Sequence, residues 1–496
     1  MKNRKSLSCD FLIIGGGTIG LPVSIWLSEQ TNKKIICIEA GSDKKTVMNF
    51  FGNSRLTGDI YHGAENGRRF GLGGTSSVWG GALAPFYQND CIDYDWPISS
   101  KELMPFSSYI EDLFSLPRNR WPNIFSDSLD DNYVLRNAIW PAFNKRNVYK
   151  NLKNRVKKHK NLTILHDSPV IKIETNDSIS NVTVSNKMFS NIKSKKIIVC
   201  AGAIESTRLA MLISNNNRIG KGFCDHLSAP IGKIVPNNRD NLNKQFAFKF
   251  IENSSMISCR FELSNNSNDR KKIPPHNFHI SPIDINDKSS SPFNHIRNIM
   301  RAMQERSFPK LRDIFGVFTN IGWFLKFVFW FLFKKTLLWP EKTDIELHLV
   351  IQQEVNEKNS LALDADNIDR FGNPITKINW KIKDKDIMNI NLAIDAFNHF
   401  WNKSDNKKYG KLELYDIKSV KEAIKECGGI YHPTSSLSFG NKDIHPIDKN
   451  LYLKGAKNIQ FVSTAILPTG GGINPTMMAL LLSARCVHQH ANCDKN

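Results

Sequence analysis

The chain has 496 residues, of which 41% are hydrophobic, 23% charged and 10% aromatic. These proportions are typical of a globular protein, and they exclude disordered, collagen-like and coiled-coil chains. At roughly 150 residues per domain, the length fits about three domains or one large enzyme of two lobes. The formal net charge of +20 points toward nucleic acid or an anionic membrane surface as a partner.

The basic residues are not accompanied by a nucleic-acid-binding motif. The sequence has no helix-turn-helix, zinc-finger or RNA-binding signature, and its densest basic run, residues 153–160, lacks aromatic stacking partners. Lys and Asn are also spread along the whole chain, which fits a plain compositional bias. We therefore expect no nucleic-acid partner, and an anionic membrane surface remains a candidate partner.

The cysteines and the N-terminus indicate a cytoplasmic protein. None of the nine cysteines forms a C-x-x-C motif, so we expect no metal site and no redox dithiol. Cys37 and Cys200 lie within apolar strand patterns, as small core residues do in proteins of a reducing compartment. Lys2 and Arg4 precede an apolar run at 11–14 that is too short for a signal sequence.

The chain opens with a predicted βαβ unit. Residues 9–14 form an apolar strand pattern, residues 15–20 read G-x-G-x-x-G, and residues 21–30 have helical spacing. A second strand at 34–38 ends at Glu39, where a carboxylate is placed to accept both ribose hydroxyls of an adenine dinucleotide. No arginine follows this residue, so FAD or NAD is expected rather than NADP. The predicted cofactor contacts are Gly15, Gly17, Thr18, Ile19, Gly20 and Glu39.

Two further glycine-containing stretches follow. Residues 71–81 hold several glycines directly after Arg68 and Arg69, and such a loop permits close approach of the backbone to a flat or anionic ligand. A buried strand pattern at 195–200 then runs through Gly202 into a helix. This repeats the order of strand, glycine and helix that lines the edge of a dinucleotide site.

The C-terminal residues complete a family resemblance. Residues 431–434 open a loop, 458–463 form a strand pattern, and a glycine-rich stretch at 468–476 leads into an apolar helix at 477–485. With these residues, the chain closely resembles the glucose-methanol-choline (GMC) flavoprotein oxidoreductases over nearly its full length. The resemblance rests on the N-terminal fingerprint with Glu39 and on LGGTSSVWGG, AGAIESTRLAM, GKGFCDHL, YHPTSSLSFG and GGGINPTMMAL, all in family order.

The resemblance implies an α/β fold of two domains. A discontinuous, Rossmann-like FAD-binding domain would be assembled from residues 1–95, 155–230 and 428–496. A substrate domain, built on an antiparallel sheet with helices, would come from 96–154 and 231–427.

The patterns within the predicted substrate domain fit this architecture. Residues 246–251, 256–263, 345–352 and 375–382 alternate or run apolar in the manner of strands. Residues 366–373 have the composition of a hairpin turn.

The resemblance also implies bound FAD that is not covalently attached. Members that tether flavin use a histidine at the position of Val78, and a valine cannot form that bond. Ser463 stands where an aspartate is common, which puts that local contact in question. The further cofactor contacts implied are Gly74, Thr75, Ser77, Trp79, Gly80, Val170, Gly202, Ser463 and Thr464.

The expected chemistry is oxidation of an alcohol. An alcohol that loses a hydride must also lose its hydroxyl proton, and a neutral histidine is a suitable base at pH 7. The resemblance places His432 in the catalytic histidine position and Asn474 in the partner position that hydrogen-bonds the substrate oxygen. Ser435 departs from the family, which usually has glycine there.

The sugar-acting bacterial members resemble the chain most, so the expected substrate is the CH–OH group of a sugar, glycoside or polyol. The electron acceptor stays open between oxygen, a quinone and a redox protein. Two alternatives are kept: a GMC-like flavoprotein with lyase or photochemical activity, and a non-catalytic flavin-binding protein.

An aromatic amphipathic segment at 293–339 is the least family-like part. Its stretch 314–333 is long enough to span a bilayer, but one crossing would leave Gly15 and His432 on opposite sides of the membrane. We therefore predict one in-plane helix that docks on an anionic membrane surface, burial in the protein or in a dimer interface being the alternative. The polar residues expected along one face are Arg312, Thr319, Lys326 and Lys334.

Overall fold

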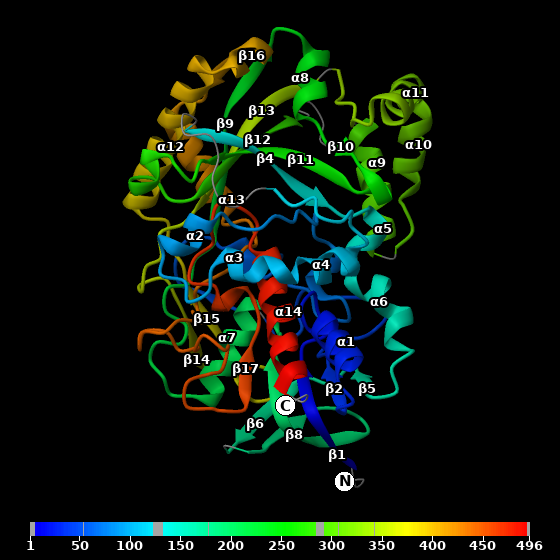
Figure 1. The fold of residues 1–496 in the computed structure, drawn as a ribbon, viewed down its shortest axis with the longest axis vertical. Helices are drawn as coiled ribbons and strands as arrows, with labels where there is room; N and C mark the ends of the chain where they lie inside the picture. The colour runs from blue at the N-terminus through cyan, green and yellow to red at the C-terminus, as the bar shows by residue number, and fades with distance from the viewer. Residues whose placement is uncertain are drawn as a thin grey trace.

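A computed structural model describes residues 5–52, 54–122, 132–176, 178–283, 292–305, 307–341 and 343–493. Lys2 and Arg4, on which part of the N-terminal prediction depends, lie outside these residues. The chain forms two lobes, one built on a mainly parallel sheet and one on an antiparallel sheet (Figure 1). The predicted α/β class is confirmed.

The first sheet holds the predicted βαβ unit. Its strand order is β5-β2-β1-β8-β7-β6, and β17 pairs with β8. Strands β5, β2, β1, β8 and β17 run parallel, whereas β6 and β7 form an antiparallel extension. The bounds are β1 Lys5–Ile14, β2 Ile35–Ile38, β5 Leu162–Leu165, β6 Val170–Thr175, β7 Ser180–Val184, β8 Phe189–Val199 and β17 Ile459–Phe461. All seven strands lie within 1–95, 155–230 and 428–496, although the domain boundaries themselves stay a prediction.

Helices cover this sheet on both sides. The C-terminal helix α14 (Thr476–Cys493) runs through the lower lobe in Figure 1, and its residues from Met477 to Leu482 are all buried. A helix that is apolar around its whole circumference needs such an enclosed position. The others around this lobe are α1 Gly20–Gln30, α2 Gln88–Ile92, α3 Ser100–Leu103, α4 Ser107–Phe114, α5 Phe143–Arg146, α6 Val148–Val156 and α7 Gly202–Ile213.

The second sheet is antiparallel, as expected. Its order is β10-β11-β12-β13-β9-β16, and β4 pairs with β11. Helix α12 (Asp384–Lys403) packs Phe397 and Trp401 against Phe261 and Phe278 of the sheet, which makes an aromatic core. The remaining bounds are β4 Tyr133–Trp140, β9 His226–Pro236, α8 Arg239–Phe246, β10 Lys249–Phe250, β11 Met256–Leu263, β12 His276–Ile283, β13 Asp344–Gln352, β16 Gly410–Leu414 and α13 Ile417–Cys427.

Two strand predictions need correction. Residues 246–251 do not form one strand: Phe246 ends helix α8, whose first turn is capped by Asn238, and only Lys249–Phe250 pair with β11. The strand predicted at 375–382 corresponds to β15 (Pro374–Asn379), which ends earlier. It does not join the second sheet but forms a separate small sheet with β14 (Ser360–Ile368) and β3 (Arg55–Leu56). The hairpin turn before β15 is confirmed, because the Asp369 carboxylate accepts hydrogen bonds from the amides of Phe371 and Asn373.

The single amphipathic helix predicted at 314–333 is wrong. The chain forms α9 (Pro292–Glu305), α10 (Leu311–Thr319), α11 (Ile321–Phe329) and a π-helical turn, η6 (Trp330–Lys334). The break lies at Asn320, whose side-chain amide donates to the carbonyl of Gly316 and whose backbone leaves helical geometry. Helix α10 and the segment Ile321–Lys334 meet at 80°, and within the described ranges no single helix is long and apolar enough to cross a membrane.

Candidate functional site

A cavity of about 680 Å³ opens at the carboxyl ends of β1, β2 and β8. Helices α1, α7 and α14 all begin at its wall, where Ile19, Gly202 and Thr476 line it. Helix N-termini present free amide groups and the positive end of the helix dipole, which favour phosphate groups. The crevice beyond the carboxyl ends of parallel strands is also where α/β folds bind dinucleotides.

Most of the predicted site residues line this one cavity. They are Gly15, Gly17, Thr18, Ile19, Glu39, Gly74, Thr75, Trp79, Gly80, Val170, Gly202, His432, Ser463, Thr464 and Asn474. Gly20 and Ser77 are not among the lining residues. A Cβ on Gly20 would lie 1.8 Å from the carbonyl oxygen of Gly15, so this glycine brings helix and strand together. The Ser77 hydroxyl instead donates to the Gly74 carbonyl and stabilises the loop.

The carboxylate of Glu39 holds three loops at the cavity wall. Its Oε1 accepts hydrogen bonds from the amides of Gly41 at 3.0 Å and Gly71 at 2.8 Å, and its Oε2 accepts from Gly16 at 2.8 Å. Each carboxylate oxygen has two lone pairs, so Oε1 is saturated and Oε2 has one lone pair left. We therefore expect one ribose hydrogen bond at Glu39, where the sequence predicted two.

The wall of the cavity suits FAD. Ser463 Oγ is buried and has no hydrogen-bond partner among the described residues, and Ser463 lines the cavity. A buried hydroxyl of this kind calls for a polar partner from a ligand. The two glycine loops meet closely, since a Cβ on Gly74 would lie 2.9 Å from the Cα of Gly17. The backbone of both glycine loops is thus accessible to a flat or anionic group. The residues of the cavity wall fit FAD and would hold it.

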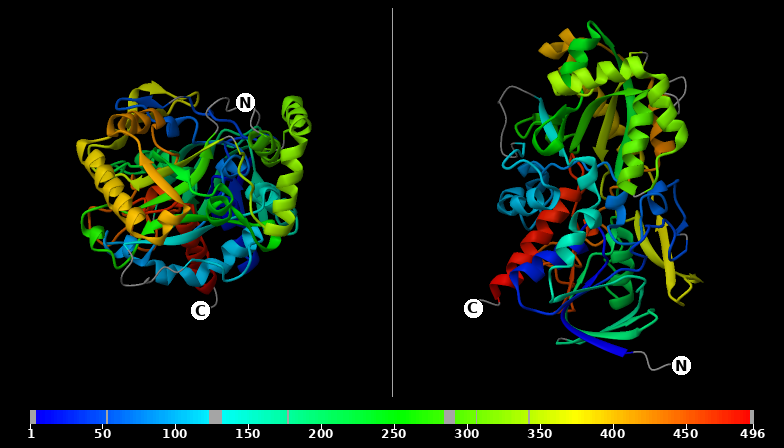
Figure 2. Two further views of the ribbon diagram at one scale, coloured as in Figure 1. Left: turned by 90° about the horizontal axis from the view of Figure 1, so that it is seen from above. Right: turned by 90° about the vertical axis from the view of Figure 1, so that its right-hand side faces the viewer.

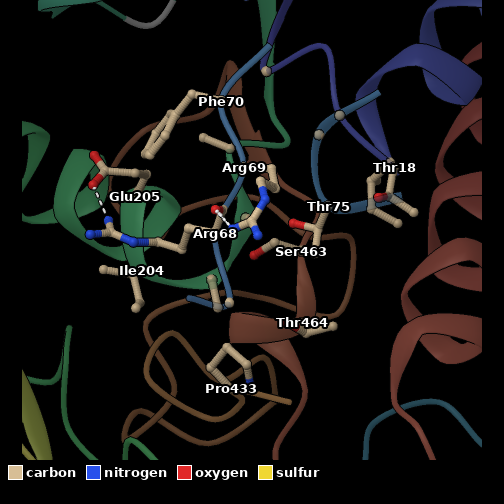
Figure 3. A pocket seen from close by; sticks show the side chains of 18 of the residues that line it. Thr18, Arg68, Arg69, Phe70, Thr75, Ile204, Glu205, Pro433, Ser463 and Thr464 are labelled. Atoms are coloured by element: carbon tan, nitrogen blue, oxygen red, sulfur yellow. Dashed lines mark hydrogen bonds and ion pairs between the residues drawn. The ribbon is translucent and has the colours of Figure 1, made fainter. Parts of the chain in front are cut away.

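Charged residues that the sequence did not single out as contacts also line the cavity. Arg68 forms a 2.8 Å ion pair with Glu205, and Arg69 points into the same space as Thr75 and Ser463 (Figure 3). The two consecutive arginines before the glycine cluster were the sequence signal that could have predicted these contacts. Arg301 and Glu305 come from α9, a helix far away in the sequence, and nothing local pointed to them.

His432 and Asn474 meet at the cavity, as predicted. The Nδ2 atom of Asn474 lies 2.9 Å from Nε2 of His432, and both residues line the cavity wall. The other ring nitrogen of His432, Nδ1, lies 3.0 Å from Nδ1 of His226. Nε2 of His226 in turn lies 2.8 Å from the carbonyl oxygen of Gly471.

This chain of contacts determines which nitrogen of His432 carries the proton. The Gly471 carbonyl can only accept, so His226 must donate from Nε2, and its Nδ1 is then an acceptor when the ring is neutral. His432 must therefore donate from Nδ1. Its Nε2 is left unprotonated and faces the amide of Asn474, which is the form a base requires.

Both imidazoles are neutral at physiological pH. Burial, together with nearby His226 and Arg260, holds the pKa of His432 well below its ordinary value. Burial is also the main reason that the pKa of His226 falls to about 4. The basic form of His432 is thus present throughout the neutral range.

Asp225 fixes the position of the histidine loop. Its carboxylate accepts hydrogen bonds from the amides of His432 at 2.9 Å and His226 at 2.7 Å, and from the hydroxyl of Tyr61 at 2.8 Å. Tyr431, directly before His432, has a φ of 68°, a strained conformation for a non-glycine residue. Asp225 and His226 lie in GKGFCDHL, which supported the resemblance but was assigned no role. Only the tertiary structure shows this role.

Asp225, His226 and His432 also offer potential metal-ligand atoms within 4.8 Å of one another. Both nitrogens of each ring and both carboxylate oxygens already take part in hydrogen bonds. The arrangement is that of a hydrogen-bonded base, and we derive no metal chemistry from it.

Ser435 has a strained backbone conformation. Its φ is 69°, in the left-handed region that glycine adopts freely, and its hydroxyl donates to the carbonyl of Pro468 at 2.9 Å. Ser435→Gly relieves about 1–2 kcal/mol of backbone strain but removes the hydrogen bond to Pro468, which contributes a similar free energy. We therefore expect a nearly unchanged free energy of unfolding. Ser435→Ala keeps the strain and loses the bond, so the free energy of unfolding should fall by about 1–3 kcal/mol. Urea unfolding of both variants checks this, and an alanine variant as stable as the glycine variant would contradict it.

Comparisons with known proteins give one family match and several structures of similar fold. Residues 355–483 match the family model described as GMC oxidoreductase. Pyridoxine 4-oxidase from Mesorbium loti superposes with a TM-score of 0.60 at 16% identity, covering 98% of this chain and 99% of that one. Formate oxidase superposes with a TM-score of 0.59 at 14% identity, covering 99% of both chains.

An arginine variant of the formate oxidase from Aspergillus oryzae RIB40, studied for its effect on FAD modification, gives a TM-score of 0.58 at 14% identity over 99% of both chains. No curated protein matches the sequence significantly. The C-terminal part of the chain thus matches the GMC oxidoreductase family model, and nearly the whole chain shares the fold of the two named oxidases.

Proposed function

We propose that the protein oxidises the CH–OH group of a sugar, glycoside or polyol, using FAD that is not covalently attached. The observation that carries the proposal is the pair His432 and Asn474, which converge at 2.9 Å on the wall of the cofactor cavity. The sugar class rests on the motif resemblance, since the two named neighbours are oxidases of pyridoxine and formate.

The residues of the pair divide the proton chemistry between them. A substrate hydroxyl that takes the place of Asn474 at Nε2 of His432 gives its proton to this nitrogen and accepts a hydrogen bond from Nδ2 of Asn474. His432 becomes a cation, and its Nδ1–H bond to neutral His226 holds the ring in place. Bound FAD supplies the hydride acceptor. Trp79 and Trp140 also line the cavity and give it apolar surface.

An anaerobic screen of alcohols, sugars and polyols tests the proposal. Purified protein is mixed with each compound, and bleaching of the flavin absorbance is recorded. A sugar or polyol that reduces the flavin supports the proposal. If only simple alcohols reduce the flavin, the proposed sugar substrate is wrong, whereas the proposed alcohol oxidation is supported.

Two other functions are separated by the same screen. Ser435 and Ser463, which depart from the family, are the residues that favour a non-catalytic flavin-binding protein. Such a protein would bleach with no compound. A lyase or a photochemical enzyme would convert its substrate without leaving the flavin reduced.

The cofactor should leave the protein on unfolding. Val78 lines the cavity at the place where a tethering histidine would stand, and it cannot bond the ring. We expect yellow protein with about one FAD per chain, all of it released by acid or guanidinium. Filtration after denaturation measures this, and flavin retained by the unfolded chain would contradict it.

His226 is expected to act as a positioning residue. His226→Leu removes the acceptor for Nδ1–H of His432, and we expect flavin reduction to slow by about 10–100-fold, as when the partner that orients a functional histidine is lost. His226→Asn keeps an acceptor oxygen and should restore most of the rate.

The pH profile distinguishes positioning from general damage. In the leucine variant burial still lowers the pKa of His432, but the further lowering by His226 is lost, so the pKa should rise and the rate should begin to fall at a higher pH than in the parent protein. Equal losses in both variants with an unchanged profile would mean that His226 is merely structural.

A further inference from the structure

The segment Leu311–Lys334, comprising α10, α11 and η6 and called here the docking pair, lies on the outside of the upper lobe. Figures 1 and 2 show it at the edge of the molecule, beside α9. None of the residues of α11 is buried, and in α10 only Asp313 and Gly316 are. These helices therefore lack the enclosed face that a helix of a soluble domain normally has.

The docking pair exposes large apolar side chains along its length. Leu311 is 83% exposed and Phe333 is 73% exposed, although both are among the side chains that folding usually removes from water. A monomeric protein seldom exposes so many large apolar side chains within one short segment. The exposed members are Leu311, Ile314, Phe315, Phe318, Ile321, Leu325, Phe329, Phe331, Leu332 and Phe333.

The charge around the docking pair is basic. Its one acidic residue, Asp313, is buried and bonded to His295 of α9 at 2.9 Å. Lys326 pairs with Glu341, while other cations stand at both ends of the pair. The exposed basic residues of the pair and its flanks are Lys310, Arg312, Lys326, Lys334 and Lys335.

We propose that the docking pair binds the surface of an anionic lipid membrane without crossing it. Basic residues beside exposed aromatic residues complement anionic headgroups and the acyl boundary below them. A second copy of the chain would bring two basic surfaces together on molecules that each carry a net charge of +20, which opposes self-association.

The exposed fractions of the aromatic side chains indicate which of them would enter the lipid. Trp330 is only 2% exposed, and Trp323 and Phe327 are half-buried, so these three aromatic side chains are less accessible to lipid. Phe315, Phe318 and Phe329 are instead exposed.

Both ends of the docking pair are bonded to the rest of the protein. Its C-terminal end bonds to the second sheet, where the amide of Phe250 donates to the Lys335 carbonyl at 2.7 Å and the rings of Phe250 and Phe331 lie 4.6 Å apart. Its other end bonds to α9, whose Arg301 and Glu305 line the cavity. Docking would therefore bring the cavity close to the lipid surface, where a membrane-borne substrate is available.

Flotation with lipid vesicles tests the proposal. Holoenzyme is mixed at low salt with vesicles of phosphatidylcholine and phosphatidylserine, or of phosphatidylcholine alone, and centrifuged through a density gradient. We expect the wild type to float with the anionic vesicles. The triple variant Phe315→Ser, Phe318→Ser, Phe329→Ser should float at least about tenfold less.

A matched control replaces exposed apolar residues elsewhere. The variant Ile92→Ser, Met188→Ser, Ile368→Ser removes three side chains of similar exposure and should float like the wild type. A second variant, Lys310→Glu, Arg312→Glu, Lys334→Glu, should lose the preference for phosphatidylserine. Circular dichroism and bound flavin confirm that every variant is folded.

Failure of the wild type to float, or flotation of the triple phenylalanine variant at the wild-type level, would overturn the proposal. Sedimentation velocity gives the competing result: a wild-type dimer that the triple phenylalanine variant converts to monomer, with no flotation, would assign this face to a second copy. All of these outcomes are independent of the substrate, so they leave the proposed alcohol oxidation untouched.

Discussion

His432→Ala should slow reduction of the bound flavin by roughly 100-fold or more, because general bases contribute about 10² to 10⁴ to such steps. FAD occupancy should change little, since the His432 side chain bonds to His226 and Asn474 and carries no part of the glycine loops. Stopped-flow absorbance under anaerobic conditions, with a substrate found by the screen, measures the rate. Asn474→Ala should be milder, because it removes a hydrogen-bond donor and leaves the base in place.

The pH dependence gives an independent check on His432. The base must be neutral to act, and its pKa lies well below the ordinary histidine value because of burial. Lowering the pH through 6.5 should therefore leave the rate of flavin reduction unchanged, with a decline only at more acidic pH. Parental rates in both His432→Ala and Asn474→Ala would mean that the catalytic pair is wrongly assigned.

Gly17→Ala should weaken FAD binding by about tenfold to a hundredfold, equivalent to roughly 1–3 kcal/mol of steric cost in a packed site. Gly17 lines the cavity, and within the protein its added Cβ would meet only the Cα of Gly74 at 3.7 Å, an ordinary contact. The methyl group therefore enters the space meant for the cofactor and leaves the fold intact. Fluorescence titration of the apoprotein with FAD measures the affinity, and circular dichroism measures folding.

Two other glycines provide controls for this experiment. Gly322→Ala adds a methyl group where nothing lies within 4 Å and outside the cavity, so FAD affinity should stay at the wild-type level. Gly20→Ala would place its Cβ 1.8 Å from the Gly15 carbonyl, so it should lower stability as well as FAD binding. If Gly17→Ala bound FAD as tightly as the wild type, the dinucleotide would not lie against this loop.

Local sequence predicted the N-terminal part of the cofactor site, because the signals of that part are short-range. A strand, a glycine turn, a helix and an acid follow one another within the βαβ unit, so spacing alone predicts where Gly15, Gly17 and Glu39 meet a dinucleotide. The roles of His432 and Asn474 came from the family resemblance, and the structure brings their side chains to 2.9 Å.

Tertiary structure alone decided how those residues are supported. His226 and Asp225 reach His432, and Tyr61 reaches Asp225, from parts of the chain distant in sequence, and no periodicity predicts such contacts. The same holds for the bond to Glu39 from the amide of Gly71, which together with the neighbouring amide of Gly41 takes up Oε1.

The helical segment shows the same limit in local structure. Hydrophobic spacing correctly predicted an aromatic helical region after α9, but one side-chain bond from Asn320 ends α10 and turns the chain by 80°. That turn, together with the packing of Trp330, sets which aromatic side chains face outward. Pattern determines that a segment is amphipathic, whereas its contacts with the rest of the fold decide which face remains exposed.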